Sequence, residues 1–331
     1  MRSEKESGYV GQRKYLLTID LYKTLEGFAR TGLKIPDQSF CESSSQRLIQ
    51  KLKECLPYCE LEVIQFHEVV NRLAALAREI SMGIPEVVIV STIPDVAAKL
   101  GGHCLQVNRI VDCSGKMLGI GPRPGYASLG EQFNRIKRDQ PVILVEDGSF
   151  SGGTVSKIIE LIELSNRSIE YLVVGFLFPS AKKNILKVFP DISRIHCLRD
   201  DNFLDWMPDH DFYPFLPNSG RVVGYSYNGQ VLPVYLHNGL SLSMPYLLPY
   251  GQPADWANIV PEKQYEFSIF CIHEAIALFY KMERLNGEYV TLERLLGTHP
   301  RASFAVTPKA KGFPHIKERI FNILHDDAHM L

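Results

Sequence analysis

The first quarter of the chain has the spacing of apolar residues that is typical of helices. Apolar side chains recur every three or four positions in LIQKLKECL, residues 48–56, and again in VVNRLAALAREI, residues 69–80. This spacing places them on one face of a helix, so each run predicts an amphipathic helix. Gly83 and Pro85 then interrupt the pattern. We therefore expect residues 1–85 to form a mostly helical N-terminal region.

The pattern changes after residue 85, where short apolar runs alternate with helical periods. Buried strands are expected at residues 86–92, 141–147, 169–179 and 195–198, and helices at 95–102, 153–164 and 180–189. Apolar strands that alternate with helices are typical of a parallel sheet with both faces covered. The fold class is therefore α/β, with a core at residues 86–200.

Residues 201–331 form a third region, a C-terminal extension. Its first part, from Trp206 to Trp256, is rich in Pro, Gly and aromatic residues and has few helical periods. A long helix is expected at residues 267–285 and a short one near 292–297, followed by a polar tail. We expect this extension to pack on the α/β core.

The composition is that of a soluble globular chain. Of the 331 residues, 45% are hydrophobic and 22% are charged, and the net charge of -1 gives no general basic field for nucleic acid. There is no apolar run long enough to cross a bilayer, and the N-terminus is charged rather than apolar. We expect a cytoplasmic protein that is not in a membrane.

The seven cysteines are expected to be reduced thiols. Cys55 and Cys59 could begin a metal site with His67, but no second pair follows at a matching spacing. Buried thiols are the better interpretation.

The segment VILVEDGSFSGGT, residues 142–154, carries the clearest chemistry. Four apolar residues are followed by Glu146 and Asp147, then by a loop of Gly, Ser and Thr that leads into a helix. Ligands of parallel sheets bind at the carboxyl ends of the strands, and amides at a helix N-terminus bind anions. The carboxylates would repel a phosphate, so they must face sugar hydroxyls or Mg²⁺. Together these features predict a site for ribose 5-phosphate.

This segment resembles the motif of type I phosphoribosyltransferases that binds phosphoribosyl diphosphate (PRPP). The resemblance implies that Glu146 and Asp147 contact the ribose 2′- and 3′-hydroxyls and hold Mg²⁺ directly or through water. It also implies a loop around the 5′-phosphate, made of Ser149, Phe150, Ser151, Gly152, Gly153 and Thr154. Gly148 and Ser149 depart from the family, which usually has aliphatic residues after the acids.

The family also has a pyrophosphate loop after an earlier strand, and its equivalent here is VSTIPDVAAK. Ser91 and Thr92 could donate hydrogen bonds there, and Lys99 could compensate the charge of Asp95, which opposes a pyrophosphate. The alternative is a plain strand end with Asp95 as the N-cap of the next helix.

Arg123 lies on a turn stiffened by prolines, roughly where the family has its catalytic loop. A guanidinium there could grip pyrophosphate through two hydrogen bonds, or the turn could be an ordinary solvated surface. The acceptor base is expected to bind under a hood formed by the C-terminal extension or the N-terminal helices. His210, between two aspartates, is either a proton shuttle or a structural histidine.

The segment LLTIDLYKTLEG, residues 16–27, superficially resembles the nucleophile strand DxDxT of haloacid-dehalogenase phosphatases. Tyr22 occupies the place of the second aspartate, so we set this resemblance aside.

The expected function is transfer of a phosphoribosyl group between PRPP, bound with Mg²⁺, and an unidentified base. The alternative is a non-catalytic regulatory or effector protein that binds PRPP or a nucleoside monophosphate within a protein complex. A homo-oligomer is a further possibility. The basic tail at residues 298–319 is a weak candidate for nucleic-acid binding, because its charge is modest and mixed.

Overall fold

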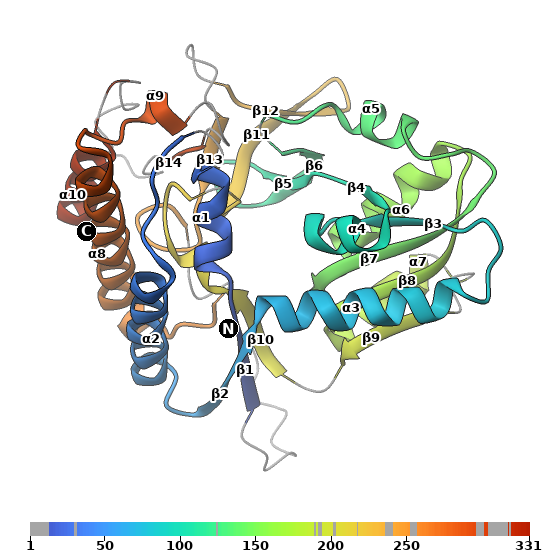
Figure 1. Cartoon of the computed structure of the whole chain (residues 1–331), viewed down its shortest axis with the longest axis horizontal. Coiled ribbons are helices and arrows are strands. Elements are labelled where there is room, and N and C mark those ends of the chain that lie inside the picture. Colours follow the sequence, from blue (N-terminus) through green and yellow to red (C-terminus); the bar gives the residue numbers. More distant parts are fainter. Residues whose placement is uncertain are drawn as a thin grey trace.

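The computed structural model shows three β-sheets and the helices that cover them (Figure 1). It describes residues 13–29, 32–123, 125–188, 190, 194–200, 203–216, 218–235, 241–251, 257–295, 301–303, 317 and 319–331. Most of the basic tail at 298–319 lies outside these residues.

The largest parallel sheet is built from the region predicted as the α/β core. Its strand order is β4-β3-β7-β8-β9, from β3 (Val88–Ser91), β4 (His103–Cys104), β7 (Pro141–Ser149), β8 (Ser168–Leu177) and β9 (Ile195–Arg199). The apolar residues of β7 alternate between its two faces. Leu144 packs with helices α6 (Gly153–Leu164) and α7 (Pro179–Val188), whereas Ile143 packs with α3 (Phe66–Ser81) and α4 (Pro94–Leu100). The prediction of a parallel sheet flanked by helices is confirmed.

A second, smaller parallel sheet joins the N-terminal region to the start of the C-terminal extension. Its order is β10-β1-β2, formed by β1 (Arg13–Ile19), β2 (Cys59–Gln65) and β10 (Phe203–Pro208). Helices α1 (Leu21–Ala29) and α2 (Gln38–Cys55) lie between β1 and β2 in the sequence. The helical pattern of this region therefore missed two strands. In β1 four consecutive residues are buried, and no residue of β2 is buried, so neither strand alternates between buried and exposed positions.

The third sheet combines strands of the core region with strands of the extension. Its order is β14-β13-β11-β5-β6, and β12 pairs with β11. The strands are β5 (Val107–Val111), β6 (Met117–Pro122), β11 (Arg221–Tyr227), β12 (Gln230–Pro233), β13 (Ser241–Met244) and β14 (Arg301–Ser303). The extension is thus joined to the core by backbone pairing between β11 and β5.

The remaining helices are α5 (Leu129–Asn134), the single turn η1 (Asp209–Phe212), α8 (Pro261–Asn286), α9 (Leu292–Leu295) and α10 (Ile320–Met330). The expected long and short helices are present as α8 and α9, whereas α10 was not expected in the polar tail. In Figure 1, α2, α8 and α10 stand on the left, the five-stranded sheet lies on the right, and β1 and β10 lie between them.

Two general expectations can be compared with the structure. No helix in the described part of the chain is long and apolar enough to span a membrane. All seven cysteines are free thiols. Within the same residues, no group of three or more His, Cys, Asp or Glu side chains is placed to bind a metal ion.

Candidate functional site

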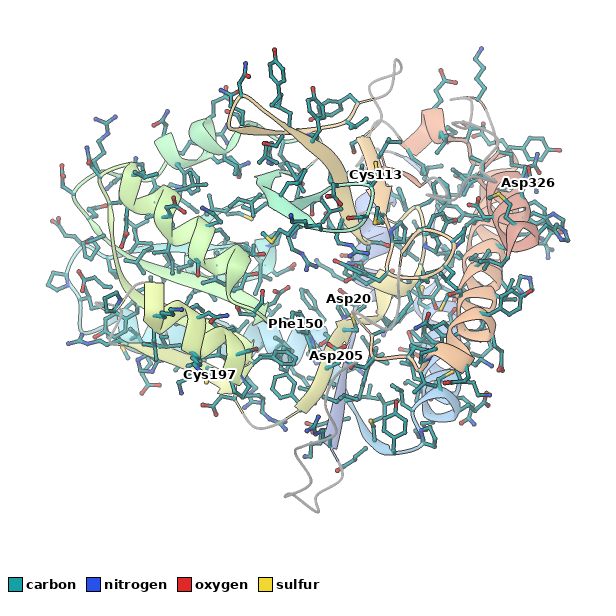
Figure 2. The ribbon with its side chains drawn as sticks, turned by 180° about the vertical axis from the view of Figure 1, so that it is seen from behind. Asp20, Cys113, Phe150, Cys197, Asp205 and Asp326 are labelled. Atoms are coloured by element: carbon teal, nitrogen blue, oxygen red, sulfur yellow. The ribbon has the colours of Figure 1, made fainter. Side chains whose placement is uncertain are left out.

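A cavity of about 480 Å³ lies where the three sheets meet. The carboxyl ends of β3 and β7 form one wall, and the carboxyl ends of β1 and β10 form another. The third wall comes from β5 and β6 and the turn after β6. Because parallel strands end at the same edge of their sheet, polar residues that follow four different strands reach one space. Figure 2 shows Asp20 and Phe150, which come from different sheets, near the middle of the molecule.

The loop between β7 and α6 lines this cavity with all five residues of 150–154. Gly152 has the left-handed φ of 81°, and a Cβ there would lie 3.1 Å from the carbonyl oxygen of Ala181. Helix α7 fixes the loop, since Ser180 Oγ donates to the Phe150 carbonyl at 2.7 Å and Asn184 Nδ2 to the Ser151 carbonyl at 3.1 Å. The first amides of an α-helix have no acceptor within the helix, so this turn of α6 can bind an anion.

Glu146 and Asp147 lie at the tip of β7, beside that loop. Glu146 is only 9% exposed, and burial, followed by the nearby charge of Asp147, raises its pKa well above the usual value. Thr92 and Arg123 act in the opposite direction and favour the carboxylate. Among the described residues, neither Glu146 Oε2 nor Thr92 Oγ1 has a hydrogen-bond partner of good geometry. Glu146 Oε2 is therefore a buried acceptor and Thr92 Oγ1 a buried donor, and a polar ligand in the cavity could form hydrogen bonds with both.

Gly148, where the resemblance implies an aliphatic residue, is explained by the indole of Trp206 in β10. A Cβ at Gly148 would lie 2.5 Å from Trp206 Cζ3, which is inside van der Waals contact. The indole lies between Phe150 and Phe176, with ring centroids at 5.9 Å and 5.0 Å, and its Nε1 donates to Thr18 Oγ1 at 2.8 Å. Trp206 therefore ties the acidic tip of β7 and the loop after it to the small parallel sheet.

Arg123 faces the cavity rather than open solvent. Its Nε donates to the carbonyl of Val107 at 3.1 Å, which holds the guanidinium beside β5. The side chain lines the cavity and lies close enough to Glu146 to lower the pKa of that carboxyl. The site thus contains a cation where the sequence predicted one, and its contact with pyrophosphate stays a prediction.

The residues predicted for the pyrophosphate loop are separated by the structure. Thr92 lines the cavity, but Ser91 is fully buried and its Oγ accepts a hydrogen bond from the amide of Ile93 at 3.0 Å. Lys99 lines a second cavity of about 380 Å³ instead. Asp95 lies in the first turn of α4, and Ile93 rather than Asp95 is the N-cap.

Asp95 is instead compensated by Lys23 of α1. Lys23 Nζ lies 3.0 Å from Asp95 Oδ1 and 3.1 Å from Glu26 Oε2, and both Lys23 and Asp95 line the main cavity. No local signal marks Lys23, because its partner Asp95 lies some seventy positions further along the chain.

The third wall adds a polar edge that the sequence did not indicate. Arg109 of β5 donates to the hydroxyl of Tyr246 and stacks at 5.7 Å from its ring, while Arg221 stacks at 4.6 Å from the same ring. Asn108 also lines the cavity, and its Nδ2 is buried without a partner in the part of the chain that is described. An aromatic ring with arginines and an amide is a combination that can hold a planar polar group.

The wall formed by β1 and β10 carries Asp20, His210 and Asp211. The Nδ1 atom of His210 lies 2.7 Å from Asp20 Oδ2. Asp209, directly behind, accepts a hydrogen bond from the amide of Asp20 at 2.8 Å and another from Ser45 Oγ at 2.7 Å. Asp20 belongs to the segment that was set aside at the sequence level because Tyr22 occupies the place of a second aspartate. No local signal marks its pairing with His210, because the two residues are 190 positions apart.

Solved structures of adenine phosphoribosyltransferases are similar to part of this chain. The enzyme from Saccharomyces cerevisiae is 19% identical over 40% of this chain and 78% of that chain, with a TM-score of 0.27. The enzyme from Giardia lamblia is 16% identical over 41% of this chain and 81% of that chain, with a TM-score of 0.30. The enzyme from Thermoanaerobacter pseudethanolicus is 14% identical over 41% of this chain and 83% of that chain, with a TM-score of 0.29.

No protein-family model matches the sequence, and no curated protein matches it. The similarity to these adenine phosphoribosyltransferases covers about two fifths of this chain.

Proposed function

We propose that this protein binds PRPP or a nucleotide that contains ribose 5-phosphate, and that it transfers the phosphoribosyl group to or from a base. One observation carries the proposal. The N-terminus of α6, which can bind a phosphate, lines the same cavity as the adjacent acids Glu146, which is buried, and Asp147, which is partly buried. A ribose 5-phosphate requires this order of an anion site next to acceptors for its hydroxyls. The unpartnered Glu146 Oε2 supports an acceptor role toward sugar hydroxyls.

In this function the chain's own residues mainly bind and orient the substrate. The amides of residues 151–154 anchor the 5′-phosphate. Glu146 and Asp147 accept hydrogen bonds from the ribose 2′- and 3′-hydroxyls and fix the position of the anomeric carbon. Arg123 neutralises charge on the departing pyrophosphate as an oxocarbenium-like state forms, and Lys23 offsets the charge of Asp95 beside it. Binding energy from the distant phosphate is thereby used to position the reacting carbon.

The acidic pair also fits Mg²⁺. This ion is commonly held by one or two carboxylates, while substrate phosphates and waters supply its other ligands. Two adjacent carboxylates, one with an unpartnered oxygen, match this requirement, and the described residues hold no larger ligand cluster. Glu146 and Asp147 would hold the ion directly or through water, and it would neutralise the diphosphate of PRPP.

The test is calorimetric titration with PRPP, with and without Mg²⁺. We expect Mg²⁺-assisted binding that weakens at least about tenfold in Asp147→Asn, a loss of about 1.4 kcal/mol. The matched control is Asp139→Asn, in an exposed turn where the positive φ of 60° suits Asn. No binding of PRPP, ribose 5-phosphate or nucleoside monophosphates to the wild type would refute the proposal.

A second candidate function, a non-catalytic sensor of PRPP or nucleotides, is favoured by one observation. The acidic residue Asp95 lies at the position expected for pyrophosphate, and its charge is already balanced by Lys23. An acid there weakens the binding of a diphosphate. In the same titrations, binding of ribose 5-phosphate or a nucleoside monophosphate without binding of PRPP would favour this second function.

A further inference from the structure

The wall opposite the acidic pair carries a histidine–aspartate dyad that the proposed ribose site does not use. β1 and β10 are parallel neighbours, with Thr18 paired to Pro208. Asp20 and His210 each follow that pair by two residues, so they emerge side by side at the carboxyl edge of the small sheet. Both side chains are buried, about 8% and 12% exposed respectively, and both line the cavity.

The aspartate fixes the orientation of the imidazole. Asp20 Oδ2 lies 2.7 Å from His210 Nδ1, and Asp20 Oδ1 accepts from the His210 amide at 3.3 Å. A carboxylate on Nδ1 sets the ring tautomer in which Nδ1 carries a proton, so the second nitrogen, Nε2, can accept one. Nε2 lies on the side of Asp211, 3.6 Å from its Oδ1. That oxygen accepts from the Gly220 amide at 3.2 Å, which holds it in place.

Acidic side chains surround the dyad. Asp209 lies directly behind Asp20 and is fully buried, and burial raises its pKa well above the usual value. Burial raises the pKa of Asp20 to about 6, with a smaller contribution from Asp147 across the cavity. Asp20 and Asp211 both face the ring. Lys23, Arg109 and Arg123 also line the cavity, and Lys23 is already paired with Asp95.

An independent feature shows that this cavity is built for a polar ligand. Thr92 Oγ1 and Glu146 Oε2 are on the opposite wall, each in a side chain more than nine-tenths buried, and neither has a partner among the described residues. The ribose site and the dyad therefore face one shared space. A ligand held by the β7 loop would present its anomeric side within that space.

We propose that His210, oriented by Asp20, is the general base that takes the proton from the attacking ring nitrogen of the acceptor. This inference rests on the proposed phosphoribosyl transfer. The bond between the anomeric carbon and pyrophosphate oxygen breaks, and its electron pair leaves with pyrophosphate. The acceptor nitrogen forms the new bond to that carbon, and its proton passes to His210 Nε2. The resulting imidazolium is stabilised by Asp20 and later releases the proton to solvent. In the reverse direction the same imidazolium protonates the leaving base.

The chemistry defines the acceptor class. The acceptor is a planar heterocycle whose reacting nitrogen carries a hydrogen, because only such an acceptor has a proton for the dyad to remove. Acidic side chains on this wall disfavour a ring that bears its own carboxylate there.

The central variant is His210→Asn. The amide nitrogen of Asn can take the place of Nδ1 and keep the hydrogen bond to Asp20, while the second ring nitrogen is removed. The assay is pyrophosphate release from PRPP with adenine, guanine, hypoxanthine, uracil and orotate as probe bases. We expect PRPP affinity within about twofold of wild type and kcat lower by about 10²–10⁴ with the best base. The acid limb of the pH profile of kcat/KM should disappear. Free imidazole should restore part of the activity of His210→Ala.

Two further variants separate the roles. Asp20→Asn should lower kcat without rescue by imidazole, because the orientation of the imidazole is lost while the imidazole remains. His196→Asn is the matched control, since His196 lies on β9 against Tyr171 and outside the cavity lining. It should behave as wild type.

The outcomes distinguish this proposal from the proposed function. Failure of the wild type to bind PRPP refutes phosphoribosyl transfer itself. Binding of PRPP without turnover of any probe base overturns the dyad's role. The dyad's role is also overturned if His210→Asn keeps the wild-type kcat and pH profile. It is overturned as well if His210→Asn loses PRPP affinity by the same factor as kcat.

Discussion

The packing of Trp206 against Gly148 gives the sharpest test of how the site is held in shape. Gly148→Ala adds a single methyl group, which would lie 2.5 Å from Trp206 Cζ3 and 2.6 Å from Cε3. The indole cannot move freely, because it stacks between Phe150 and Phe176 and donates to Thr18 Oγ1. Overpacking of this kind costs about 1–3 kcal/mol.

This cost can be expressed as a change in melting temperature. With about 2.1 cal/mol/K per residue, the 331 residues give an unfolding entropy of about 0.7 kcal/mol/K, so the melting temperature should fall by about 1–4 °C. Part of the strain should move Phe150 and the acidic tip of β7. We therefore expect calorimetric affinity for ribose 5-phosphate to fall at least about tenfold, equivalent to 1.4 kcal/mol.

Two comparisons make the result specific. Gly130→Ala adds the same methyl group in exposed helix α5, where nothing lies within 4 Å, and it should cause no loss of stability or binding. In a Trp206→Leu background the obstructing ring atoms are absent, so Gly148→Ala should cost much less than it does in the wild type. Equal costs in both backgrounds, or unchanged ribose 5-phosphate affinity in Gly148→Ala, would show that Trp206 does not position this site.

Two other predictions concern charge. Lys23→Met should weaken the binding of PRPP about tenfold more than the binding of ribose 5-phosphate, because it leaves Asp95 unpaired next to the diphosphate. In the same titrations, Lys99→Met is the control and should not discriminate between the two ligands. Burial raises the pKa of Asp205 to about 8, so its protonated form stabilises the fold at low pH, and that contribution is lost as pH rises from about 4 through 8. The free energy of unfolding, measured by chemical denaturation, should fall with rising pH more steeply in the wild type than in Asp205→Asn, by up to about 1.4 kcal/mol per pH unit. If the free energies of the two proteins change with pH in parallel, this assignment is wrong.

The local content of the sequence predicted the α/β fold and singled out the acidic strand tip and the loop that follows it. The apolar runs of β7 and β8 are long, continuous and bounded by turn residues, and burial on both faces demands that pattern. The segment 142–154 identified an acidic strand tip and a loop before a helix, and the structure places both on the cavity. These features depend on neighbours in the sequence, so they are visible without the fold.

The rest of the candidate site depends on contacts between distant segments. Helical periods report only which face of a helix is buried, and they carry no information about which partner covers it. Lys99 is close to Asp95 in the sequence, but it points to a different cavity, while Lys23 makes the ion pair. Strand β10 pairs with β1 across about 190 residues, and this pairing alone brings His210 to Asp20.

The sequence by itself thus determined the class of fold and the position of the Gly- and Ser-rich loop and of the acids before it. Short-range rules of burial, turns and helix ends suffice for these. The tertiary structure decided which cations, and which histidine and aspartates, share the cavity. Their partners are chosen by parallel strand pairing and by the packing of Trp206 on Gly148, and both depend on the free energy of the whole core rather than on any one segment.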